Sequence, residues 1–196
     1  MIAKDHLERP GCAVVTIGHS NRTLETFIDL LQTYRVTQVI DVRTVPRSRH
    51  NPQFNQEILP HDLKAAGIGY LHMPGLGGLR HPSLGSTNMG WRNASFRGFA
   101  DYMGTPEFEN QLGELIGLAK RKQIAMMCAE ALPWRCHRSL IADALEVRGV
   151  GVAHILSPTH LQPHRMTPFA HVEGKHLVYP SEKMTTSSQE SRMKTH

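Results

Sequence analysis

Cysteine is scarce in this sequence, and long apolar runs are missing from it. Only three cysteines occur among 196 residues, an odd number that a secreted scaffold held together by disulfides rarely has. No apolar run approaches the roughly 20 residues that a membrane-spanning helix needs. The first residues, MIAKDHLERPGC, carry scattered charges and lack the apolar segment of a secretory signal. We therefore expect reduced thiols in a cytoplasmic protein that has no membrane partner.

Two common binding signatures are also missing. The glycines of PGLGG, residues 74–78, do not follow the order of a dinucleotide fingerprint and do not open a helix. No helix-turn-helix or zinc-finger signature is present that would indicate a module for reading base sequence. These absences argue against a dinucleotide cofactor and against sequence-specific DNA recognition.

The sequence does contain enough apolar material for one ordinary core. Hydrophobic residues make up 40% of the chain, and two separate domains of this total length would each be cramped. We predict a single domain over residues 1–180, followed by a disordered polar tail over 181–196, where no periodicity remains. The formal net charge of +5 favours an anionic partner, such as nucleic acid or another phosphate-bearing ligand.

Apolar strands alternate with helical patterns along the chain. Apolar runs of strand length occur at residues 13–17, 38–42, 68–73, 123–128 and 151–156. Capping residues and helical periodicity between these runs predict the intervening helices. Because parallel strands need a crossover element, we expect an α/β fold with a mostly parallel sheet of about five strands and helices on both faces.

Residues able to carry chemistry follow the ends of the predicted strands. In open α/β sheets, ligands bind at the carboxyl ends of the strands, so these side chains should line one crevice. One pair, Asp41 and Arg43, has a structural alternative, in which the aspartate caps the loop and the arginine pairs with it. The residues at the ends of the first, second and fourth strands are His19, Ser20, Asp41, Arg43 and Cys128.

The densest group of candidates lies in MCAEALPWRCHRSL, residues 127–140. This segment places Cys128 and Glu130 at a strand end. It places Cys136, His137 and Arg138 at the start of a helix. The positive end of the helix dipole and the basic neighbours stabilise a thiolate at that position. Cys136 is therefore predicted to be the better activated of the two thiols.

Two kinds of chemistry fit this segment. A transition metal ion, zinc or iron, suits a mixed set of Cys128, Cys136 and His137, with Glu130 or His19 as a further ligand. The spacing of the two cysteines exceeds that of a short zinc knuckle. Alternatively, one cysteine is a nucleophile and His137 or His19 is its base.

Two further readings of the segment remain. A loop from Cys128 to Arg135 could cradle an anion, as in cysteine-dependent phosphatases and sulfurtransferases, but it contains a proline and a tryptophan where small residues let backbone amides converge. In the structural reading, both cysteines are buried packing residues. Glu130 and Arg138 then form a local ion pair.

Arginines interleaved with aromatic residues occur across the polar loops. Such a pattern suits phosphate groups and unstacked bases. The structural alternative is a solvated basic rim with aromatic residues buried in the core. The residues concerned are Arg43, Arg47, Arg49, Arg80, Arg92, Arg97, Phe54, Trp91 and Phe96.

Four motifs, in order along the chain, resemble those of one family. They are TIGHSNRTLETFIDLL, VIDVRTVPRSRHNPQFN, YLHMPGLGG and MCAEALPWRCHRSLIADAL. From about residue 14 to 156, the chain is similar to the family catalogued as domain of unknown function 488, whose members are small α/β domains without an established activity. The resemblance implies this fold and implies that the GHS, DVR, C-x-E and CHR motifs carry the site, while it leaves the reaction open.

The leading hypothesis is an enzyme that acts on a phosphate-bearing or nucleic-acid substrate, with Cys136 or a bound metal ion at its chemical centre. His19 or His137 would transfer a proton, and Glu130 would orient a partner. One alternative is a non-catalytic module that binds nucleic acid or an acidic protein through a basic sheet edge. Another is a metal-binding or sensing protein. The residues predicted to contact substrate are Ser20, Asp41, Arg43, Arg47, Arg49 and Arg138.

Overall fold

The computed structural model describes residues 12–181 of the chain. The predicted polar tail lies outside the described residues except for its first position. The side chain of Cys12 also lies outside them, so the two cysteines discussed below are Cys128 and Cys136.

The centre of the fold is a six-stranded sheet with the order β3-β2-β4-β1-β5-β6. Its first five strands pair in parallel, which confirms the predicted α/β architecture. The structure adds an antiparallel edge strand, β6, and a separate two-stranded hairpin of β7 and β8. The strands are β1 (Cys12–Gly18), β2 (Gln38–Asp41), β3 (Gly69–His72), β4 (Ile124–Cys128), β5 (Gly151–Ser157), β6 (His160–Pro163), β7 (His171–Glu173) and β8 (His176–Val178).

Helices connect the parallel strands and begin where the sequence provides caps. Thr23 Oγ1 accepts the backbone N–H of Thr26 at 3.2 Å and so caps the first helix, as its sequence position predicted. Thr105 caps the fourth helix in the same way, and Pro106 opens that helix. The helices are α1 (Leu24–Thr33), α2 (Leu59–Ala65), α3 (Ala94–Tyr102), α4 (Pro106–Ala119) and α5 (Arg138–Glu146). Short 3-10 turns are η1 (Pro52–Phe54), η2 (Pro74–Leu76) and η3 (Pro133–Arg135).

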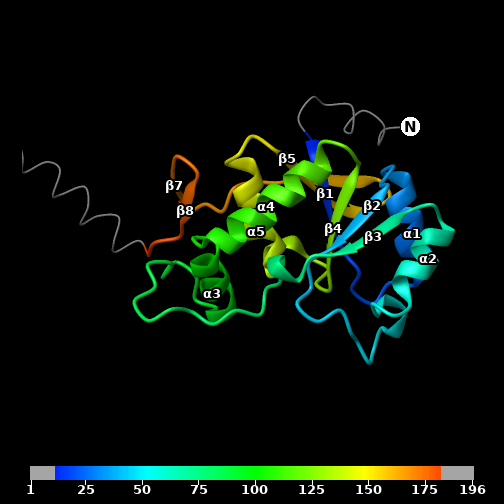
Figure 1. Ribbon diagram of the computed structural model, residues 1–196, viewed down its shortest axis with the longest axis horizontal. Coiled ribbons are helices and arrows are strands. Elements are labelled where there is room, and N and C mark those ends of the chain that lie inside the picture. The colour runs from blue at the N-terminus through cyan, green and yellow to red at the C-terminus, as the bar shows by residue number, and fades with distance from the viewer. Residues whose placement is uncertain (1–11, 182–196) are drawn as a thin grey trace, which may run out of the picture.

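Helices cover both faces of the sheet, as Figure 1 shows. Successive residues of a central strand point to opposite faces, and both faces are buried, so these strands are mostly apolar rather than alternating between apolar and polar residues. On one face Val15, Val39 and Met127 pack with α1 and α2. On the other face Val14 and Met126 pack with α3, α4 and α5. Burial of each large side chain contributes about 1.5–3 kcal/mol before the entropy of ordering is subtracted.

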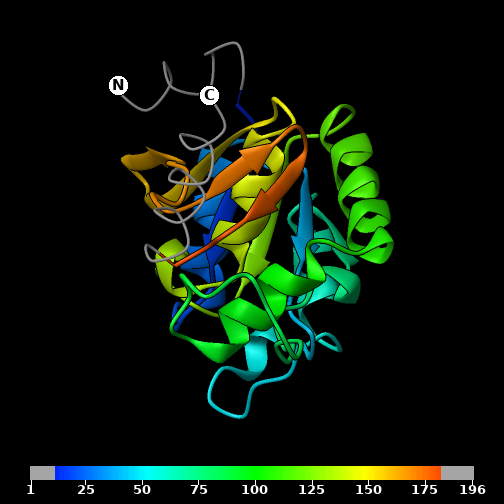
Figure 2. The same ribbon diagram turned by 90° about the vertical axis from the view of Figure 1, so that its left-hand side faces the viewer.

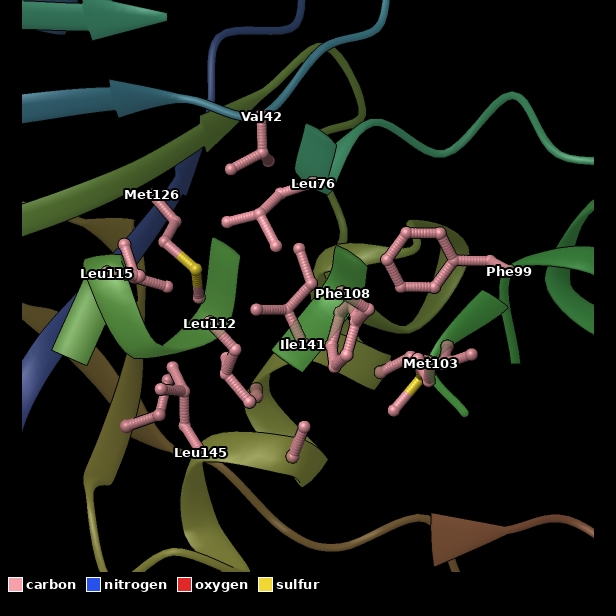
Figure 3. Packing of buried hydrophobic residues seen from close by; sticks show 14 of the residues in the cluster. Val42, Leu76, Phe99, Met103, Phe108, Leu112, Leu115, Met126, Ile141 and Leu145 are labelled. Atoms are coloured by element: carbon pink, nitrogen blue, oxygen red, sulfur yellow. The ribbon is translucent and has the colours of Figure 1, made fainter. Parts of the chain in front are cut away.

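The second of these cores is drawn in Figure 3, where side chains from α4 and α5 gather beside those of the sheet. Leu112 and Leu115 come from α4, and Ile141 and Leu145 come from α5. All of them are completely buried. This packing fixes the start of α5 relative to the end of β4, and both of these positions contribute to the site described below.

The hairpin of β7 and β8 lies outside the main sheet (Figure 2). Its connection to the body runs through Tyr179, whose backbone N–H donates to Asn88 Oδ1 at 2.8 Å. Among the described residues, no helix combines the length and the apolar character needed to cross a membrane.

Candidate functional site

A cavity of about 740 Å³ opens at the carboxyl ends of β1, β2 and β4. The loops that follow these three strands supply most of its wall. Further residues come from the turn after η2 and from the start of α3. The lining includes residues 19–21, 43–45, 78–79, 95–96 and 128–131, together with Arg135, Cys136 and His137. The predicted crevice at this sheet edge is therefore present.

Hydrogen bonds between neighbouring strands draw the loops together at this edge. His19 N–H donates to the Cys128 carbonyl at 2.9 Å, and Ser20 N–H donates to the Ala129 carbonyl at 2.8 Å. Gly18 allows this close approach, because a Cβ at its position would overlap the Glu130 carbonyl. The loop after β1 and the loop after β4 are thus adjacent walls of one cavity.

Two thiols and one imidazole converge on the cavity wall. One ligand atom from each of Cys128, Cys136 and His137 lies within 4.8 Å of the other two. Cys136 Sγ is 3.7 Å from His137 Nδ1. The two cysteines are almost completely buried, yet both border the cavity. The structure therefore brings together the three residues that the sequence suggested as metal ligands.

The hydrogen-bond partners of His137 determine the tautomer of its ring. They decide which ring nitrogen carries the proton and which presents a lone pair to the thiols. His137 Nε2 lies 3.1 Å from the carbonyl oxygen of Val42 and 3.0 Å from that of Leu76. Carbonyl oxygens only accept, so we assign the proton to Nε2. Nδ1 then presents its lone pair to the cysteines. Gly78 packs directly against the ring, and a Cβ there would overlap it.

The two thiols differ strongly in acidity. A hydrogen bond from Cys128 to Cys136 lowers the pKa of Cys136 and raises that of Cys128. Burial raises the pKa of Cys128 further, while the Arg138 guanidinium favours the Cys136 thiolate. Two adjacent thiolates without a cation would repel each other. One proton is therefore retained between them unless a positive ion takes its place.

Arg138 lies behind the cavity wall rather than in it. Its side chain is almost completely buried and donates to the carbonyl oxygen of Glu130 at 2.6 Å and to that of Ala131 at 2.9 Å. The ion pair with the Glu130 carboxylate, which was one reading of the sequence, is replaced by these main-chain contacts. Arg138 therefore holds the loop after β4 against the start of α5.

His19 borders the cavity, but both of its ring nitrogens are already used. Nδ1–H donates to the Ser20 carbonyl at 2.8 Å, and Nε2 accepts from Arg43 Nη1 at 3.3 Å. The ring stacks on Phe54 at a centroid distance of 4.3 Å. Burial lowers the pKa of His19 to about 4, so the ring is neutral at physiological pH. Its atoms are not part of the cysteine and histidine cluster.

Asp41 and Arg43 form a buried ion pair, as the structural alternative for them proposed. Arg43 Nη2 donates to Asp41 Oδ2 at 2.5 Å, and its backbone N–H donates to Oδ1 at 3.1 Å. Tyr70 OH donates to the same carboxylate at 2.7 Å. Arg43 borders the cavity, whereas Asp41 is fully buried behind it. Most of the charge on Arg43 is thus compensated within the protein.

The remaining predicted residues lie at the mouth of the cavity or beyond it. Ser20 lines the cavity and has a left-handed backbone with φ 50°. Arg47 lines it and pairs with exposed Glu57 at 2.8 Å. Glu130 also lines it and is exposed. Arg49 is exposed and does not belong to the lining.

The sequence did not indicate the supporting roles of several residues around the cavity. The Phe54 ring stacks on the His19 ring. Thr44 Oγ1 accepts the backbone N–H of Leu79 at 3.1 Å. Gly78 was visible only as part of a glycine-rich segment. Its role depends on the His137 ring, which comes from a distant part of the chain and could not be inferred from local sequence.

Comparisons with known proteins identify one sequence family. Residues 23–145 match the family described as Domain of unknown function DUF488. The match includes the segment from Cys128 to Arg138, whereas His19 and Ser20 precede it. No curated protein and no solved structure matched the chain. The reaction must therefore be argued from the geometry of the site.

Proposed function

The chain belongs to the DUF488 family, whose description names no reaction, and we propose that it is a metal-dependent enzyme that acts on a phosphate-bearing substrate, a nucleotide or a nucleic acid. One observation carries this proposal. The donor atoms of Cys128, Cys136 and His137 converge within 4.8 Å on the wall of a cavity bordered by arginines.

One of the donor separations matches that expected for tetrahedral zinc, and the other donor pairs lie within 4.8 Å. Zinc binds sulfur at about 2.3 Å and imidazole nitrogen at about 2.0 Å, which puts neighbouring ligand atoms about 3.5–3.8 Å apart. The distance of 3.7 Å from Cys136 Sγ to His137 Nδ1 falls within this range. The two carbonyls that accept from His137 Nε2 would orient the ring, as hydrogen-bond acceptors on the far side of a metal-bound histidine usually do.

The donor set also predicts what kind of metal site this is. Mixed thiolate and imidazole ligands favour zinc over magnesium or calcium, and iron is the alternative. Three protein ligands leave a fourth position for water or substrate, which is the pattern of catalytic rather than structural zinc. A bound divalent ion would also replace the proton that Cys128 and Cys136 otherwise share. The thiolates would then no longer repel each other.

The arginines at the mouth of the cavity support the proposal that the substrate is anionic. Arg135 borders it, is exposed, and has no ion-pair partner among residues 12–181. Arg47 borders it as well, and its partner Glu57 is exposed, so a phosphate can compete for the guanidinium. Arg43 is deeper and already paired with Asp41. We propose that Arg47 and Arg135 bind phosphate, while Arg43 holds the wall in position.

Elemental analysis of the full chain, purified without chelator, tests the metal centre. We expect about one zinc ion per chain, lost in Cys128→Ser and in Cys136→Ser. Cys12→Ser is the matched control, because Cys12 begins β1 at the edge opposite the cavity. Circular dichroism of each variant checks that the chain still folds. A metal content that does not change in the first two variants would rule out this centre.

A thiolate nucleophile is the second candidate, and the lowered pKa of Cys136 favours it. In this case no metal binds, and iodoacetamide modifies Cys136 faster than Cys128, with His137 as the neighbouring base. If the protein stores or senses a metal, it would instead bind a stoichiometric amount of metal ion and turn over no substrate. A pure binding module would keep salt-sensitive nucleic-acid binding after both cysteines are replaced.

A further inference from the structure

We propose, resting on the metal centre above, that the reaction is the hydrolytic deamination of a nucleobase and that Glu130 is its proton carrier. In this reaction water replaces an exocyclic amino group, and ammonia is released. The proposal depends on the position of Glu130, on the charge of the donor set, and on the shape of the cavity.

Glu130 lines the same cavity as the donor set without being one of its members. It follows Cys128 by two positions and lines the same cavity, but its carboxylate is not among the clustered donor atoms. Its main chain is held by Arg138, whose guanidinium donates to the Glu130 carbonyl at 2.6 Å. Within residues 12–181 the carboxylate has no hydrogen-bond or ion-pair partner. A fixed backbone and an uncommitted carboxylate suit a group that moves protons.

Zinc-dependent nucleobase deaminases combine the same elements. They hold zinc with histidine and cysteine ligands, and they use a glutamate that is not a ligand as the general acid and base. Here a Cys-x-Glu motif at 128–130 is followed by Cys136 and His137. The order and spacing of the ligands differ from the deaminase signature, so the likeness is one of chemistry and not of sequence.

The charge of the donor set points to a neutral reacting group. Zinc with two thiolate ligands has no net charge, so it offers little stabilisation to a phosphoryl group that carries several negative charges. Attack of water on a carbon of a neutral ring needs less charge stabilisation from the zinc centre. A zinc centre with thiolate ligands also acidifies water less strongly, which makes a nearby base such as Glu130 necessary.

The cavity can hold a base at its interior and a phosphate at its mouth. Its volume of about 740 Å³ lies within the usual range for small-molecule sites, about 300–1,000 Å³. The His19 ring, supported by Phe54, and the Phe96 side chain provide flat or apolar surfaces in the wall. Arg47 and Arg135 stand at the exposed end. A nucleotide would therefore enter with its base directed towards Cys128.

The proposed reaction balances without an oxidant or a further substrate. Water attacks the ring carbon that bears the amino group, a C–O bond forms, and Glu130 passes one water proton to the adjacent ring nitrogen. Glu130 then passes the second proton to the amino nitrogen as the C–N bond breaks. Ammonia leaves with the electron pair of that bond, and the ring carbon becomes a carbonyl. A metal ion held by Cys128, Cys136 and His137 would supply the Lewis acid that binds the attacking water.

The test measures ammonia released by the zinc-loaded full chain. Cytidine, adenosine and guanosine 5′-monophosphates are supplied, as is a single-stranded oligonucleotide that contains all three bases. We expect ammonia from one of these bases, confirmed by mass spectrometry of the product. Glu130→Gln should lower the rate about 10²- to 10⁴-fold. Glu114→Gln, an exposed glutamate on α4, is the matched control and should keep the rate.

A second measurement reads the metal centre without turnover. The cobalt-substituted protein should show a visible spectrum that changes when the nucleotide substrate is added, both in the unmodified chain and in Glu130→Gln. Loss of cobalt from Glu130→Gln would make this residue a ligand and overturn its proton role. Zinc binding without ammonia from any of the three bases overturns the deamination proposal alone. Failure to bind zinc or cobalt overturns the proposed metal centre together with it.

Discussion

Replacement of Asp143 by asparagine should strongly destabilise the fold. Asp143 lies on α5 and is completely buried. Its Oδ1 accepts His164 Nε2–H at 2.8 Å and the backbone N–H of Thr167 at 3.0 Å. Its Oδ2 accepts Thr167 Oγ1–H at 2.6 Å and Tyr179 OH at 2.9 Å. Through this carboxylate, α5 holds the C-terminal part of the described chain.

The magnitude follows from the geometry of the four donors. An asparagine amide has the same shape as the carboxylate, but one of its two ends is an NH₂ group that donates. When the NH₂ group of Asp143→Asn takes the place of Oδ1, it faces His164 Nε2–H and the Thr167 backbone N–H, which both donate. When it takes the place of Oδ2, the Thr167 and Tyr179 hydroxyls can rotate to accept from it, but all four hydrogen bonds lose their charged acceptor. Hydrogen bonds to a charged group contribute about 1.5–3 kcal/mol each and neutral ones about 0.5–1.5 kcal/mol, so the loss in the better orientation should be about 4–6 kcal/mol. That is a large part of the roughly 5–15 kcal/mol that stabilises a domain.

Urea unfolding followed by circular dichroism measures this loss directly. Asp29→Asn is the matched control, because Asp29 lies on the exposed side of α1, and its free energy of unfolding should change by less than about 0.5 kcal/mol. A loss below about 1 kcal/mol in Asp143→Asn would refute the reasoning. It would mean that water or a rearranged segment replaces the hydrogen bonds at little cost.

Two further predictions concern acid stability and the His137 ring. Burial lowers the pKa of His19 to about 4 and that of His154 to about 3 in the folded chain. On acidification, the unfolded chain therefore protonates these two histidines at a higher pH than the folded chain does. Stability should fall as the pH decreases from about 6.5 towards 4, by up to about 1.4 kcal/mol per pH unit for each histidine. Urea unfolding at several pH values would show this, and a flat profile would contradict it. Gly78→Ala should weaken zinc binding about 10- to 100-fold by displacing the His137 ring, whereas Gly113→Ala, which meets no neighbour, should not. Competition with a chromophoric chelator measures both affinities, and equal values would exclude a role for Gly78.

The parallel strands and their helices were predictable because each has a strong local signal. Buried strands such as IAMMC, residues 124–128, are apolar throughout, and Thr23 and Thr105 mark helix starts. The edge strand HLQP and the strands HVE and HLV were not predicted. They are only three or four residues long, which is too short to show a clear pattern, and they are stabilised by pairing with a neighbouring strand.

The location of the candidate site was predictable to the extent that the strand ends indicate it. The convergence of Cys128, Cys136 and His137 follows from a strand end that meets a helix start. Contacts between distant positions were not predictable. Nothing near Phe54 indicates that His19 will stack on it, because their proximity depends on how the loops fold over the sheet edge.

The positions of the charged residues divide the cavity into two parts with different preferences. Arg43 is compensated by Asp41 inside the wall, and Arg138 is occupied by main-chain carbonyls. Neither guanidinium is therefore freely available to an anion. Arg47 and Arg135 remain at the mouth, where salt screens their attraction for phosphate. Under the proposed function, the affinity for a phosphate-bearing substrate should then decrease with ionic strength because of these two arginines, whereas selection among substrates should depend on the uncharged group that reaches the thiols.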